Sequence, residues 1–211
     1  MKKKTSLYYM SKSYALLIWI NYIGQQGELN GCINDVHSIK KILVDKFNFQ
    51  QNNIMMLTDD SDNMPTRVNI LRHFIEIAKK AITGDITKLF VHYSGHGYYK
   101  RDTENDETDG YDEVICPVDY ASNGFIADDV LNLIMRVFPP TCDVFALFDC
   151  CHSGTMLDLK YKYFDYNEQI CNTENMISNV IMLSGCRDDQ TSADAYISGK
   201  YCGAMTKAFI T

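Results

Sequence analysis

The sequence predicts a mostly parallel, doubly wound α/β sheet with helices on both faces. Short apolar segments alternate along the chain with longer segments whose apolar residues recur at helical spacing. The first apolar segment is nearly continuous, which is typical of a strand covered on both faces. Polar, glycine-containing loops follow two of the later strands, at the edge where such sheets bind ligands.

The first part of the chain is expected to form two strand–helix pairs. Ser13–Ile23 is a buried strand, and the segment Asn34–Phe47 is an amphipathic helix behind a capping Asn34. Asn53–Asp59 is a second strand. The second helix covers Pro65–Ile82, with Pro65 and Thr66 marking its start.

The second part of the chain carries three more short apolar strands, each bounded by polar residues: Thr87–Gly95, Asp143–Asp149 and Asn179–Gly185. Between the first two lie an acidic loop, the strand-like segment Glu113–Tyr120 and a helix over Asp128–Val137. A last helix begins near Gly203. Residues 1–211 are therefore expected to form a single domain, which suits their number.

Composition and charge exclude several classes of function. The chain is 46% hydrophobic and 22% charged, which is ordinary for a globular protein. The net charge of −7 argues against a nucleic-acid partner, since phosphate binding needs clustered Lys and Arg. The apolar run after the basic start is too short to span a bilayer. We expect a cytoplasmic protein with no membrane partner.

The eight cysteines are expected to be free thiols. The sequence has no secretion signal that would favour a disulfide framework. It also has no C-x-x-C pair, so a zinc site of the usual spacing has little support.

Two loops at the carboxyl ends of neighbouring strands carry residues typical of nucleophilic catalysis. "HYSGHG" places His96 after one strand, and "DCCHSG" places Cys150 and Cys151 after the next. A nearby imidazole activates a thiol whose ordinary pKa is about 8.5. The residues alone leave Cys150 and Cys151 as alternative nucleophiles. His152 is a rival base, but neighbours along an extended chain point to opposite faces, which favours His96.

The glycine after His96 indicates a second element of that chemistry. Gly97 allows close approach of a substrate, and its amide is expected to bind an oxyanion together with the amide of the nucleophile.

Several motifs together resemble the metacaspases, the caspase-fold cysteine peptidases of plants, fungi, protists and bacteria. They are "ELNGCIND", "VHYSGHGYY", "DEVICPVDY", "ALFDCCHSGT" and "VIMLSGCRDDQTSADA", in that order from about Ser13 onward. The resemblance implies a caspase-like (caspase–hemoglobinase) fold. It also implies an endopeptidase in which Cys151 attacks the scissile carbonyl and His96 acts as general base. A role in programmed cell death is a further implication.

Specificity for a basic side chain follows from carboxylates at the strand ends. Asp35 and Asp149 favour Lys or Arg in the substrate, especially the bidentate guanidinium. The resemblance implies that Cys32, Asp35, Ser94 and Asp149 line this first specificity pocket. The alternative role for Asp35 is a helix cap near Asn34.

Calcium is the cofactor that the resemblance implies. The acidic segment Arg101–Glu113 would otherwise be a solvated surface loop, and no EF-hand spacing is present. Calcium-activated metacaspases carry aspartates that match a set of four in this sequence: Asp112, Asp128, Asp129 and Asp158.

The resemblance also implies a division of the chain. Residues 1–158 would form a large-subunit-like portion, 159–178 a linker loop and 179–211 an incomplete small-subunit-like portion. Lys160 and Lys162 are candidate self-cleavage sites, although two lysines in a surface loop are common.

The chain departs from the family pattern at both ends. It shows no prodomain, and it stops at Thr211 inside a helix where family members continue. We expect a monomer that cleaves proteins after Arg or Lys. The alternative is a catalytically weak or inactive caspase-fold scaffold or regulator.

Overall fold

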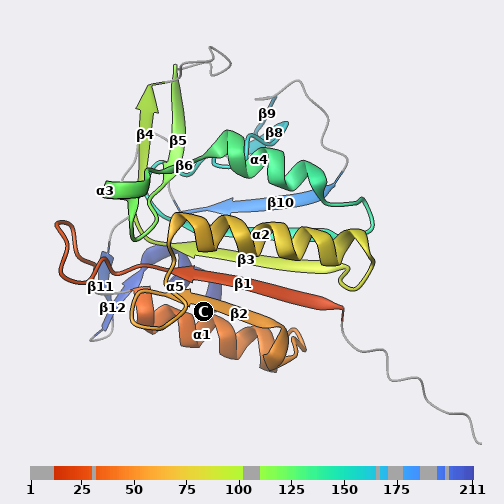
Figure 1. The fold of residues 1–211 in the computed structure, drawn as a ribbon, viewed down its shortest axis with the longest axis horizontal. Coiled ribbons are helices and arrows are strands. Elements are labelled where there is room, and N and C mark those ends of the chain that lie inside the picture. Colours follow the sequence, from red (N-terminus) through yellow and green to blue (C-terminus); the bar gives the residue numbers. More distant parts are fainter. Residues whose placement is uncertain are drawn as a thin grey trace, which may run out of the picture.

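The core of the protein is a five-stranded sheet with the strand order β10-β7-β3-β1-β2 (Figure 1). The structure is a computed structural model that describes residues 12–29, 32–101, 110–164, 167–170, 178–185, 194–197 and 200–211. Every neighbouring pair in this sheet is parallel. The strands are β1 (Ser13–Trp19), β2 (Ile54–Thr58), β3 (Lys88–Ser94), β7 (Asp143–Asp149) and β10 (Asn179–Ser184). The predicted α/β class with a mostly parallel sheet is confirmed.

Helices cover both faces of the sheet, as the buried strands indicate. Along β1, Leu16 and Ile18 join the core under α2 (Arg67–Ile82) and α4 (Asp128–Val137). The alternate residues Leu17 and Trp19 join a second core with α1 (Cys32–Asp45) and α5 (Ala204–Ile210). All seven residues of β1 are buried, because its two faces belong to two different cores.

Smaller elements surround the central sheet. The remaining helices are η1 (Gln51–Asn53) and α3 (Tyr120–Asn123). The remaining strands are β4 (Gly97–Arg101), β5 (Tyr111–Ile115), β6 (Ile126–Ala127), β8 (Tyr161–Phe164), β9 (Asn167–Ile170), β11 (Asp194–Ile197) and β12 (Lys200–Gly203). They form an antiparallel sheet β4-β5-β6 and the two-stranded pairs β8-β9 and β11-β12.

The predicted start of one helix is confirmed and that of another is wrong. Thr66 caps α2, since its hydroxyl oxygen accepts a hydrogen bond from the backbone N–H of Asn69. By contrast, α1 begins at Cys32, so Asn34 and Asp35 lie inside its first turn and neither is its cap.

The first strand is shorter than its apolar run suggests. β1 ends at Trp19, and Tyr22 adopts a left-handed backbone conformation with φ of 56°. This conformation turns the chain away from the sheet, which apolar character alone does not reveal.

Two segments expected to be loops contain strands. The linker 159–178 includes β8 and β9, which pair as a hairpin. Across it, the Tyr163 hydroxyl donates to Glu168. Lys162 lies within β8 opposite Gln169, and Lys160 precedes that strand. The ends of the acidic segment also form strands, β4 and β5, while residues 102–109 lie outside the described part.

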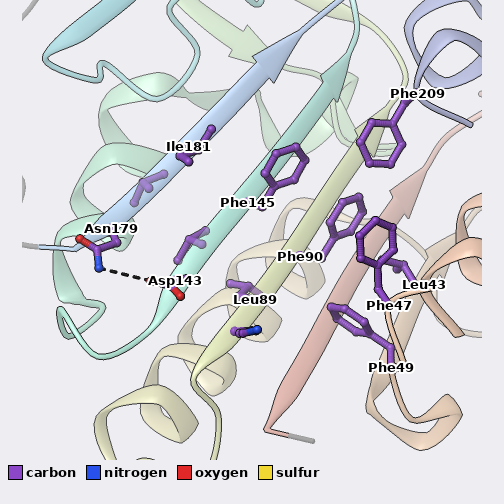
Figure 2. A pocket seen from close by; sticks show the side chains of 13 residues that line it. Leu43, Phe47, Phe49, Leu89, Phe90, Asp143, Phe145, Asn179, Ile181 and Phe209 are labelled. Atoms are coloured by element: carbon purple, nitrogen blue, oxygen red, sulfur yellow. Dashed lines mark hydrogen bonds between the residues drawn. The ribbon is translucent and has the colours of Figure 1, made fainter.

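An apolar groove of about 710 Å³ lies on the face of the sheet that α1 and α5 cover. Phe90, Phe145 and Phe209 meet in it (Figure 2). The groove runs along the amino-terminal ends of β3, β7 and β10, opposite the edge where the candidate site lies. Among the described helices, none combines the length and the apolar character that crossing a bilayer requires.

Candidate functional site

The register of the central sheet brings the two predicted catalytic loops together. Ser94 at the end of β3 lies opposite Asp149 at the end of β7. His96 and Cys151 each follow two residues later, so they leave neighbouring parallel strands at the same level. Gly97 lies against the backbone of Cys151, because a Cβ placed on Gly97 would collide with the Cys151 carbonyl oxygen. These two loops are therefore in direct contact.

The two adjacent cysteines have different environments. Cys150 is 1% exposed, and burial raises the pKa of its thiol well above the ordinary value. Cys151 is half-buried and follows it in the turn after β7. A buried thiol with a raised pKa is inert, so the structure favours Cys151 as the reactive thiol, a choice that the residues alone left open.

A hydrogen bond fixes the imidazole of His96. Its Nε2 lies 2.6 Å from the carbonyl oxygen of Gly27. A carbonyl oxygen only accepts hydrogen bonds, so Nε2 carries the proton and Nδ1 holds the lone pair of the neutral ring. The Tyr22 ring lies beside the imidazole, with 4.5 Å between ring centroids. Both contacts come from the loop after β1.

Two buried tyrosines hold the backbone around His96. The Tyr22 hydroxyl accepts from the His96 N–H at 2.9 Å and donates to the Cys116 carbonyl at 2.6 Å. The Tyr93 hydroxyl donates to the His96 carbonyl at 2.8 Å. A Cβ on Gly95 would lie within 3.0 Å of both hydroxyl oxygens, so only glycine fits between them. Sequence reasoning missed this network, and its one signal is the pair of tyrosines beside apolar strand ends.

The rival base His152 faces another residue. It has a left-handed φ of 48°, and its ring meets Tyr99 of β4 edge-on with 4.9 Å between centroids. The turn continues into Ser153, whose hydroxyl donates to the Cys150 carbonyl at 2.9 Å. His152 thus packs against the β4 strand.

Two of the predicted pocket residues share one face of the sheet. Trp19, Ser94 and Asp149 form the last row across β1, β3 and β7. Leu17, Phe90 and Leu147 lie two or four positions earlier on the same strands, and every second residue of a strand shares a face. Because these three belong to the core under α1 and α5, the row lies on that face of the sheet. Ser94 is 2% exposed and Asp149 is 4% exposed. Cys32 and Asp35 lie in the first turn of α1 on that face, but their side chains are outside the described part.

Asp149 contacts the start of α5. Its Oδ2 accepts the backbone N–H of Thr206 at 2.7 Å. Next to it, a Cβ on Gly185 would lie 3.2 Å from Asp149 Oδ1 and 3.0 Å from Met205 Cβ. The carboxylate is therefore held between the end of β10 and α5.

Three of the four predicted calcium ligands form a cluster. One carboxylate oxygen each from Asp112, Asp128 and Asp129 lies within 4.8 Å of the others. Burial, and next the charge of Asp158, raise the pKa of Asp128 well above its ordinary range. Calcium–oxygen bonds are about 2.3–2.6 Å long, so one ion could bridge oxygens at this separation. The donor set therefore suits a hard cation.

The cluster is linked to a lysine and to the loop of Cys151. Lys100 Nζ lies 2.8 Å from Asp112 Oδ2, so its positive charge lies beside the cluster. The backbone N–H of Glu113 donates to Asp128 Oδ2 at 2.6 Å. The sequence did not indicate that Glu113 belongs to this cluster. The Thr155 hydroxyl donates to Glu113 Oε2 at 2.6 Å. Thr155 follows Cys151 by four positions in the chain.

Comparisons with known proteins agree on one family. Residues 13–160 match the family model described as metacaspase, peptidase C14 domain. The chain is 40% identical over 253 residues to metacaspase-1 of Botryotinia fuckeliana, a match that covers 95% of this chain and 60% of that protein. It is 38% identical over 249 residues to metacaspase-1 of Scheffersomyces stipitis, covering 93% and 61% respectively. The chain thus spans about 60% of the length of these relatives.

A solved structure shares the fold. The crystal structure of a protein from Geobacter sulfurreducens matches with a TM-score of 0.64 and 24% identity, covering 92% of this chain and 79% of that one. This likeness supports the α/β fold.

Proposed function

Because the chain belongs to the metacaspase family, we propose that it is a calcium-dependent cysteine endopeptidase that cleaves proteins after Arg or Lys. The observation that carries the proposal is the contact between the His96 and Cys151 loops at the ends of two paired strands. Family membership supports the reaction class, and the geometry supports the assignment of residues.

The reaction needs a thiolate and a proton acceptor. With Nε2 bonded to Gly27, the Nδ1 of His96 takes the proton of the Cys151 thiol. The Cys151 sulfur then attacks the scissile carbonyl carbon. As the C–N bond breaks, the His96 imidazolium returns its proton to the leaving amine. A water molecule, deprotonated by His96, hydrolyses the thioester and releases the new carboxyl end.

The oxyanion that forms on attack needs N–H donors. Cys116 donates its N–H to the His96 carbonyl, which makes residues 96 and 116 a hydrogen-bonded pair. Pairs alternate in an antiparallel ladder, so Gly97 and Ile115 are a non-hydrogen-bonded pair. The Gly97 N–H then points away from β5. This supports its role, with the Cys151 amide, as an oxyanion donor.

Specificity for Arg or Lys rests on negative charge beside the thiol. Asp149 ends the strand that leads to Cys151, and its burial strengthens its attraction for a cation. Asp35 would add a second carboxylate from α1, and Cys32 and Ser94 would complete the wall. A guanidinium suits two carboxylates because it offers paired N–H donors in one plane.

Calcium would be held by Asp112, Asp128 and Asp129, with Asp158 as the fourth carboxylate. It would supply positive charge among buried acidic groups that otherwise repel one another. The Thr155–Glu113 hydrogen bond connects this cluster to the loop that carries Cys151, so a bound ion would act on the thiol through that loop.

Cleavage of fluorogenic peptides tests the proposal. Peptides ending in Arg, Lys or Asp are incubated with the protein, with calcium or with a chelator, beside Cys151→Ala and Cys150→Ala. Cleavage after Arg and Lys, lost with the chelator and in Cys151→Ala but kept in Cys150→Ala, is the expected result. Cleavage after Asp, or activity that survives Cys151→Ala, contradicts it. Folded protein that cleaves none of the peptides would favour the scaffold alternative.

A further inference from the structure

Behind the specificity carboxylate lies a buried polar chain that the catalytic assignment does not use. It runs from His92 in β3 through Thr206 in α5 to Asp149 at the end of β7. His92 and Thr206 are both fully buried, and Asp149 is 4% exposed. Thr206 is 57 residues from Asp149 and 114 from His92 along the chain, so only the fold brings the three together.

The first link joins the sheet to the helix. His92 Nε2 lies 2.9 Å from the Thr206 hydroxyl oxygen. Burial lowers the pKa of His92 to about 3, so the ring is neutral and this is a bond between uncharged groups. Trp19 packs against the ring, with 4.7 Å between centroids. The imidazole therefore has a fixed position from which to hold Thr206.

The second link joins the helix to the carboxylate. The backbone N–H of Thr206 donates to Asp149 Oδ2 at 2.7 Å. A hydrogen bond from an N–H to a carboxylate is among the stronger kinds, and it orients the carboxylate plane. The position of this N–H depends on how the first turn of α5 sits on the sheet.

Two anchors set that position. Phe209 near the end of α5 packs against both Phe90 and Phe145, at 6.1 Å and 6.0 Å between centroids (Figure 2). At the start of the helix the anchor is the bond between the Thr206 hydroxyl and His92. A hydrogen bond tolerates only a narrow range of distance and angle, so the bond from Thr206 fixes one point at the start of the helix.

We propose that Thr206, held by His92, is a positioning residue for substrate specificity: it orients the Asp149 carboxylate that recognises the basic side chain. The inference rests on the proposed role of Asp149 in binding Arg or Lys. It adds two residues, one from the core of the sheet and one from the last helix, to the determinants of specificity. Neither touches substrate.

The test compares two peptides that differ only in charge. Citrulline has the shape of arginine but carries no charge, so the ratio of kcat/KM for Arg over citrulline measures recognition by a carboxylate. The ratio does not depend on the fraction of folded enzyme, and a variant of reduced stability still gives a clear answer. The variants are Thr206→Val, Thr206→Ser and His92→Leu in the full chain with calcium.

The Arg/citrulline ratio should depend on the presence of the Thr206 hydroxyl. Thr206→Val, which keeps the shape but loses the hydroxyl, should lower the Arg/citrulline ratio about tenfold, mainly through KM for the Arg peptide. His92→Leu should act alike, and Thr206→Ser should restore the ratio. Thr83→Val removes a threonine hydroxyl at the end of α2 and should leave the ratio unchanged.

Asp149→Asn distinguishes a failure of the proposed pocket from a failure of the positioning role of Thr206. If this variant leaves the ratio unchanged, Asp149 does not recognise charge and the proposed pocket is wrong. If it lowers the ratio about a hundredfold while Thr206→Val does not change it, the pocket stands and the positioning role of Thr206 is refuted. A loss of kcat on both peptides alike would assign Thr206 a merely structural role.

Discussion

Replacing Gly27 by alanine tests how His96 is oriented. Gly27 accepts the hydrogen bond from His96 Nε2 at 2.6 Å, and an added Cβ would lie 3.1 Å from that nitrogen. Ordinary contacts of this kind begin at 3.4 Å, so the imidazole must shift by a few tenths of an ångström. Gly27 also has φ of +85°, where alanine costs about 1–2 kcal/mol in folding stability.

The expected effect on catalysis is separate from that on stability. A strained Nε2 hydrogen bond loses roughly 1 kcal/mol, which corresponds to about a fivefold to tenfold fall in kcat/KM. Urea unfolding measures stability, and peptide cleavage at saturating calcium measures kcat/KM.

Gly84→Ala is the matched control. Gly84 has a similar φ of +74°, but no atom lies within 4 Å of an added Cβ. Both variants should lose similar stability, and only Gly27→Ala should lose activity per folded molecule. Equal specific activities in the two variants would refute the idea that Gly27 orients His96.

Three further changes probe the cation cluster, its link to the thiol, and the buried core. Lys100→Met removes the ammonium group beside Asp112 and should tighten calcium binding, measured by calorimetry, by up to about fivefold; unchanged or weaker binding would contradict the competition. Thr155→Val removes the hydrogen bond to Glu113 and should reduce the activation of peptide cleavage by calcium without changing calcium affinity. Full activation in this variant would show that the hydrogen bond does not couple calcium binding to catalysis. In the unfolded chain His92 takes up a proton below its ordinary pKa of 6.5, whereas burial lowers its pKa in the folded chain to about 3. The free energy of unfolding therefore falls as the pH falls from 6.5 towards 3. Between pH 7 and 5 the loss from this residue is about 2 kcal/mol by urea unfolding, and a His92→Leu variant with the same pH dependence as the parent would contradict it.

The central sheet was predictable because its strands are short apolar runs with polar boundaries. β7 begins and ends at the predicted residues Asp143 and Asp149, and α4 spans the predicted Asp128–Val137. Burial on both faces leaves a short continuous apolar run, and its length and polar boundaries favour a strand over a helix. The same pattern predicted β1 too long, because Tyr22 is apolar and buried but lies in a left-handed turn after the strand.

The chemistry at the strand ends was only partly predictable. His96 and the pair Cys150/Cys151 were identified because they follow apolar strands in loops that contain glycines, and only the family resemblance singled out Cys151. The Gly27 carbonyl, 69 residues before His96, leaves no pattern in the sequence, because a carbonyl is common to every residue. Thr206 is likewise an ordinary helical threonine until the fold brings it to Asp149.

β4 and the start of β5 were missed for a physical reason, whereas the strand-like segment Glu113–Tyr120 covered only the end of β5. β4 is largely exposed and includes Tyr98 and Tyr99, whereas β5 includes the buried carboxylates Asp112 and Glu113. This reverses the usual apolar-in pattern. Buried carboxylates at a strand are costly unless a cation or hydrogen bonds compensate them, which is consistent with the proposed calcium cluster.

The reactivity of the thiols tests the central claim most directly. Brief treatment with iodoacetamide near neutral pH, followed by peptide mass mapping, gives a separate alkylation rate for each cysteine. Cys151 should react first, Cys150 should be protected by burial, and His96→Ala should slow alkylation of Cys151 by about tenfold or more. Equal alkylation of the two cysteines, or a Cys151 rate that does not change in His96→Ala, would contradict the account.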